Sequence, residues 1–198
     1  MKLDPAAMTI VRGAPLLLLA GLAGVTALVA PRPDPLRLEA RGAALAAALE
    51  ADRGAALAAP PESESILEVF SQSVKPPLPA LWEASLEDEI RADEIRALSA
   101  GLDAFEASAS GLYLAGPLSI ADARLYPTVL LMHRVLPKYY GWEEWTDAAL
   151  FWKRPNIHAW FELMGYEKAA EEAARELDAS LSEVDWSALS LDVPVYRP

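Results

Sequence analysis

The sequence predicts a mainly α-helical protein, and three stretches carry that prediction. Residues 119–122, Ser-Ile-Ala-Asp, form a capping box: the Ser119 hydroxyl can accept the N–H three residues on, and the Asp122 carboxylate can reach back to the Ser119 N–H. The apolar run that follows is too thick for one narrow stripe, which indicates a buried central helix starting at Ser119. Residues 85–108 carry apolar residues at helical spacing (Ile95, Leu98, Leu102 and Phe105).

Two phrases resemble the glutathione S-transferase family. Leu114-Ala115-Gly116 followed by the box at 119–122 matches the pattern that opens a core helix in the family's all-α half. Residues 154–161, RPNIHAWF, look like the start of the next helix in that half. The resemblance implies a glutathione S-transferase C-terminal-like helical domain. It implies nothing about activity, because both phrases are folding devices.

Composition excludes several classes of function. The chain has 198 residues, enough for one domain or two small ones, and a formal net charge of −12, which repels phosphate backbones and argues against nucleic-acid binding. It has no cysteine, so disulfides, thiolate metal sites and thiol chemistry are absent. The two histidines, His133 and His158, are too few for a histidine-rich site, and we interpret both as structural. We expect no metal.

Residues 13–30 are uncharged and almost wholly apolar, and two interpretations stay open. They can be a signal sequence or a short membrane anchor, at the lower limit of about 17 residues for a spanning helix. Alternatively, residues 1–75 are a degenerate thioredoxin-like half, which the family places before its helical half. The first strand would then be residues 8–11, the first helix 16–23 and the second strand 24–29, whose Val and Thr residues suit a strand.

The next stretch, residues 36–60, is rich in alanine. Within it, residues 49–57 can form a hairpin that turns at 52–54, or continue a plain helix, which alanine's propensity favours.

Glu62 and Ser63 also resemble the family, in which a Glu-Ser pair opens a helix and ends the thioredoxin-like half. The resemblance implies that this pair binds the γ-glutamyl end of glutathione, because free N–H groups and the positive end of a helix bind carboxylate. The alternative is that Ser63 only caps the helix. Prolines at 76–79 look like the linker between the two halves.

The rest of the chain divides into a helical domain at 76–182 and an extended tail at 183–198. The acidic residues of 85–108 are interpreted as a solvated face, and 167–181 as a last amphipathic helix. Aromatic residues concentrate in 139–161, either as core packing or as an exposed docking patch.

The groups that would activate glutathione are missing. The family needs a Tyr, Ser or Cys just after the first strand, and residues 12–24 contain none. The family's cis-proline has no counterpart either, because three alanines stand at 46–48. We therefore expect no catalytic residue.

These observations predict a non-catalytic accessory or scaffolding subunit of a larger protein complex, in contact with a membrane through residues 13–30 and belonging to a bioenergetic membrane. The alternative is a glutathione-binding transferase or reductase acting on small electrophiles, with glutathione as its cofactor. The compartment stays open between an organellar membrane and the soluble interior of the cell.

Overall fold

The computed structural model describes residues 37–83, 85–139 and 150–184, which all belong to one compact unit spanning residues 33–198. Within these ranges the chain forms six α-helices and one short 3₁₀ helix, and no strand. In chain order they are α1 (Leu38–Arg53), α2 (Pro61–Ser73), η1 (Leu78–Leu81), α3 (Asp88–Ser108), α4 (Ile120–Tyr139), α6 (Pro155–Gly165) and α7 (Lys168–Ser182). The predicted mainly helical fold is confirmed.

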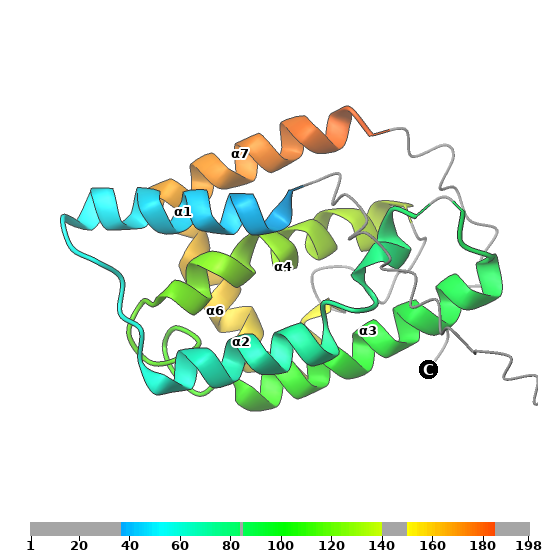
Figure 1. Cartoon of the computed structure of the whole chain (residues 1–198), viewed down its shortest axis with the longest axis horizontal. Helices are drawn as coiled ribbons and strands as arrows, with labels where there is room; N and C mark the ends of the chain where they lie inside the picture. The colour runs from blue at the N-terminus through cyan, green and yellow to red at the C-terminus, as the bar shows by residue number, and fades with distance from the viewer. Residues whose placement is uncertain (1–36, 84, 140–149, 185–198) are drawn as a thin grey trace, which may run out of the picture. The chain divides into compact units, whose positions relative to one another are not determined.

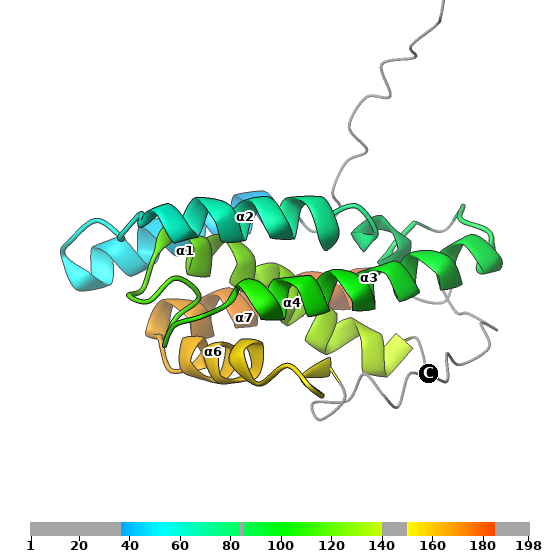
Figure 2. The ribbon, with the colours of Figure 1, turned by 90° about the horizontal axis from the view of Figure 1, so that it is seen from below.

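The central element is α4, which contacts α1, α2, α6 and α7 (Figures 1 and 2). Its side chains are buried on most faces, as the thickness of its apolar run predicts (Leu125, Val129, Leu130, Leu131, Met132, Val135 and Leu136). The helix begins immediately after Ser119. The predicted buried helix that starts at the capping box is therefore confirmed.

The alanine-rich stretch forms α1, which runs without a break from Leu38 to Arg53. Gly54 ends the helix with φ +65°, the left-handed conformation that glycine adopts without a steric penalty. The hairpin considered for residues 49–57 is wrong, because alanine favours the helix and the Asp-Arg-Gly sequence acts as its last turn and cap. The helix lies against α4 and α7 (Figure 1).

Two helix pairs approach each other closely at glycines. Gly42 of α1 lies against the Arg124 backbone of α4, so that a Cβ at Gly42 would lie 2.9 Å from the Arg124 Cα. Gly101 of α3 lies against the Ser73 carbonyl at the end of α2, and a Cβ there would overlap the carbonyl oxygen. Because glycine has no side chain, α1 can approach α4 and α2 can approach α3 at these distances.

The proline-rich stretch lies between α2 and α3, as expected of a connection that stops helices. It is not an extended linker, however, because it folds into η1 and buries Leu78, Ala80 and Leu81. Aromatic rings join the helices further inside: Phe70 of α2 contacts Phe105 of α3, and Phe105 contacts Trp160 of α6, with ring centroids 5.3 and 6.0 Å apart.

Several expectations fall on residues outside the described part of the chain. They include the apolar segment 13–30, the strands and helix expected within residues 8–29, and nearly all of the tail at 183–198. The domain boundaries at 75/76 and 182/183 stay predictions. In the three described ranges, no helix is both long enough and apolar enough to cross a membrane.

We expect Gly101→Ala to lower the free energy of unfolding by about 1–3 kcal/mol, because α2 and α3 must move apart to admit the methyl group. The matched control is Gly165→Ala at the end of α6, where an added Cβ meets open space. Chemical denaturation of both variants measures the difference, and equal stabilities would contradict the close approach.

Candidate functional site

The predicted capping box forms a buried polar site at the start of α4. Asp122 and Ser119 are both fully buried. Asp122 Oδ2 accepts the Ser119 N–H at 2.7 Å and the Ser119 hydroxyl at 2.6 Å, while Oδ1 accepts the Leu114 N–H at 2.9 Å. One carboxylate therefore holds three donors, from the helix start and from the loop that precedes it.

This geometry confirms half of the predicted box and changes the other half. Asp122 reaches back to the Ser119 N–H as expected. The Ser119 hydroxyl, in contrast, donates to the carboxylate instead of accepting the N–H three residues on. The first N–H of α4, on Ile120, instead donates to the Ala58 carbonyl at 3.0 Å, so the α1–α2 connection completes the cap.

The bond from Leu114 to Asp122 explains why the Leu-Ala-Gly phrase accompanies the box. Tyr113 and Gly116 exchange backbone hydrogen bonds in a tight turn, and Gly116 has φ +97°, which non-glycine residues rarely adopt. The backbone of Gly111 packs directly on Gly116. The turn thus delivers the Leu114 N–H to the carboxylate, a role that the sequence interpretation did not assign to it.

Burial raises the pKa of Asp122 above its ordinary value, because it disfavours the charged form. The bonds from Ser119 and from the Leu114 N–H oppose the increase in this pKa, since they stabilise the carboxylate. The Trp160 indole also lowers the pKa, although its buried Nε1 makes no hydrogen bond of normal geometry. The indole is therefore a nearby dipole and not a fourth donor.

Glu62 and Ser63 lie in the first turn of α2, where the resemblance places them. Glu62 is exposed, whereas Ser63 is 1% exposed and its hydroxyl has no hydrogen-bond partner. Ser63 does not cap the helix, because Pro60 occupies the N-cap position and no side chain there makes a cap bond. Binding of glutathione by this pair stays a prediction.

The second family phrase forms a joint between α6 and α3. Arg154, just before α6, is buried and donates to Asp103 at 2.8 Å and to the Ser99 carbonyl at 3.1 Å. Glu106 of α3 accepts the N–H groups of Asn156 and Ile157 at 2.9 and 2.8 Å. A carboxylate from another helix therefore caps α6, which the local sequence could not reveal.

The two histidines take part in ring packing. His158 stacks on Phe151 with a centroid distance of 4.8 Å, and His133 lies 5.0 Å from the Phe161 ring. Among the residues that the structure describes, no three His, Asp or Glu side chains come together as metal ligands would.

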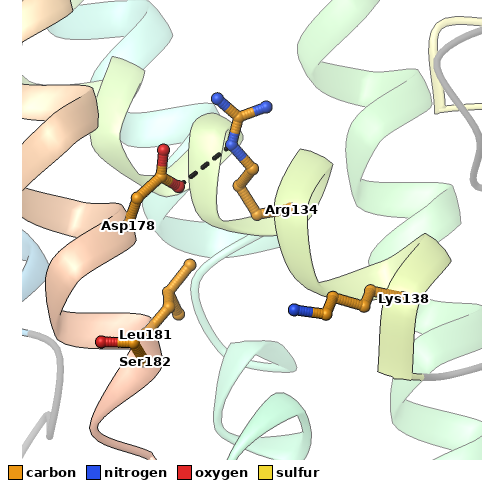
Figure 3. Close-up of a pocket in the computed structure, with 5 residues that line it drawn as sticks. All are labelled: Arg134, Lys138, Asp178, Leu181 and Ser182. Carbon is orange, nitrogen blue, oxygen red and sulfur yellow. Dashed lines mark hydrogen bonds and ion pairs between the residues drawn. The ribbon is translucent and has the colours of Figure 1, made fainter.

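A hollow of about 270 Å³ lies between α4 and α7 (Figure 3). Arg134 Nε donates to Asp178 across it at 3.1 Å, and Lys138, Leu181 and Ser182 complete the lining. Its volume is below the roughly 300–1,000 Å³ of most ligand pockets. It brings together none of the residues that the sequence singled out.

The described residues form a mainly helical unit around a capped central helix, and a family model matches part of this unit. Residues 88–163 match the model described as "Glutathione S-transferase, C-terminal domain". The predicted relationship to the glutathione S-transferase family is therefore confirmed for residues 88–163. The comparisons with curated proteins and with solved structures found no match.

We expect Asp122→Asn to lower the free energy of unfolding by about 1–3 kcal/mol at neutral pH, because an amide cannot accept bonds on both sides and strands a buried donor. Because the pKa of Asp122 is higher in the folded than in the unfolded protein, protonation of Asp122 stabilises the fold. This stabilisation is complete at pH values below the unfolded pKa of about 3.9 and is lost as the pH rises through the folded pKa. The difference in free energy of unfolding between wild type and variant should therefore be largest in acid and decrease towards neutral pH. Denaturation at several pH values measures it, and a gap that widens towards neutral pH would contradict the raised pKa.

Proposed function

We propose that this protein is a non-catalytic, glutathione S-transferase-like accessory or scaffolding subunit of a larger protein complex. The observation that carries the proposal is how the helical unit uses its buried charges. Arg91, Asp122 and Arg154 are the buried charged side chains among the described residues, and each bonds to backbone groups. These charges hold helices and loops in place.

Arg91 shows this use most clearly. It lies in the first turns of α3, is 2% exposed, and donates to the carbonyl oxygens of Ala80, Glu83 and Leu86. A guanidinium that binds three carbonyls of the preceding segment fixes the η1–α3 connection. It is not available to bind a substrate carboxylate.

The sequence supports the same proposal, because it lacks the group that activates glutathione in the family. In the family, a Tyr, Ser or Cys after the first strand activates the glutathione sulfur, and residues 12–24 hold none of these. Without such a group, a bound thiol would keep its ordinary pKa and stay mostly protonated at neutral pH. We therefore assign the chain a role in assembly, with protein partners and no glutathione cofactor.

The apolar segment 13–30 is the part of the proposal that concerns a membrane. A run of this length and composition suits contact with a lipid bilayer or with the apolar surface of a membrane complex. On that ground we propose a complex of bioenergetic membranes as the setting.

We expect the affinity-tagged full chain, purified under mild detergent from its native source, to elute with a fixed set of partner proteins. The measurement is size-exclusion chromatography followed by mass spectrometry, with the tag alone as the control for unspecific capture. Recovery of the chain only as a free monomer would contradict the proposal.

The alternative is a glutathione-binding enzyme, and the observation in its favour is the unpaired hydroxyl of Ser63 at the start of α2. If it is right, glutathione resin should retain the protein, and Ser63→Ala should abolish retention while the helical circular dichroism is unchanged. Ser65→Ala, an exposed serine of the same helix, is the control. No retention of the wild type at millimolar glutathione would eliminate this alternative.

A further inference from the structure

Trp152 is a large apolar side chain that the fold leaves in solvent. It lies in the turn before α6 and is 65% exposed, between the buried residues Phe151 and Arg154. Removing a tryptophan from water is favourable, so an exposed tryptophan can contribute free energy when a partner covers it. Tryptophan is also the residue type most enriched at the energetic centres of protein interfaces.

The turn that carries Trp152 is held rigidly. Phe151 packs between the rings of His158 and Phe161, with centroid distances of 4.8 and 5.2 Å. On the other side, Arg154 is bonded to Asp103 and to the Leu150 carbonyl. A side chain presented from such a fixed base loses little conformational entropy when it binds.

The backbone beside Trp152 is strained. Lys153 has φ +60°, a left-handed conformation that residues other than glycine rarely adopt. Strain of this kind persists where the surrounding structure enforces it and is concentrated at functional sites. Here it turns the chain so that Phe151 and Arg154 point inward while Trp152 stays outside.

Charges near the turn indicate the chemistry of the partner. The side chains of Asp103 and Glu162 are each 66% exposed. Asp103 pairs with Arg154 of the turn, and Glu162 lies 3.5 Å from the His158 ring nitrogen. Glu106 lies at the same end of α6. Two cations stand against these three carboxylates, namely the exposed Lys153 and the buried Arg154, which is paired with Asp103. One carboxylate remains in excess, in a chain whose net charge is −12.

We propose that the Trp152 turn is the docking point for a partner protein that offers an apolar pocket flanked by lysine or arginine side chains. The indole would enter the pocket, and its ring face and the neighbouring carboxylates would attract the cations. A second copy of the chain does not fit this chemistry, because it is equally acidic. This inference specifies the partner of the proposed scaffold and rests on that function.

The test uses a fluorescently labelled amphipathic peptide of leucine and lysine as the probe, with a leucine–glutamate peptide of equal length as its counterpart. Anisotropy measures binding to the full-length protein. We expect Trp152→Ala to weaken binding of the lysine peptide by about tenfold or more, as truncation of a central interface aromatic does. Glu162→Gln should weaken it at low salt only, because exposed charges are screened at high salt.

The matched control is Tyr166→Ala, since Tyr166 is 87% exposed at the opposite end of α6. It should change the affinity by less than about twofold, as a residue outside the interface does. Equal affinities for the two alanine variants would show attraction by net charge alone and overturn the proposal. Equal binding of the glutamate peptide would overturn it as well.

The outcome can be separated from that of the proposed function. If the native complex is recovered and Trp152→Ala leaves its composition unchanged, the docking point is wrong and the scaffold stands. If the native source yields only monomer, the scaffold fails, and the peptide measurement still reports on the turn.

Discussion

The arrangement of the helical unit depends on the Asp122 carboxylate and its three donors. These donors come from Leu114, inside the tight turn of Tyr113–Gly116, and from Ser119, three residues after it, and all of them are buried. A buried donor without an acceptor costs about 1–3 kcal/mol, so no alternative path of this loop is comparably stable unless it supplies new acceptors. Because α4 contacts α1, α2, α6 and α7, the direction that this site gives to its first turn reaches most of the core.

A carboxylate also satisfies free N–H groups at the start of α6. The N-cap residues of α1, α2, α3, α6 and α7 contribute no side-chain cap bond. Where partners are seen, they come from distant parts of the chain: Glu106 caps α6, and the Ala58 carbonyl accepts the first N–H of α4. The free N–H groups at a helix start have no partner within the helix. Here they bond to acceptors on other elements and so connect the helix to them.

The sequence predicted the parts of this structure that depend on local patterns. The apolar run of α4, the spacing of Ile95, Leu98, Leu102 and Phe105 in α3, and the two family phrases are all readable within a few turns of helix. The joints were not predicted, because Glu106 and Asn156 are separated by 50 residues and no local pattern connects them. Arg91 was missed for a related reason: within an acidic helix it looks like one more solvated charge, and its burial depends on the path of the preceding segment. The candidate site followed the same rule. The position of Glu62 and Ser63 at a helix start was predictable from the motif, whereas the burial of Ser63 depends on how α2 packs.

These joints also bear on how a reaction site and a fold can separate. Within the described part of the chain, the bonds of Asp122, Arg91 and Glu106, and those of Arg154 to Asp103, Ser99 and Leu150, connect residues within 80–157. Selection on assembly alone would preserve such a unit, since its stability comes from backbone groups satisfied inside the helical domain. The surface of such a unit can change independently of its core. Selection for assembly would then favour an exposed tryptophan on a strained turn, within an acidic surface, over a polar loop at the same place.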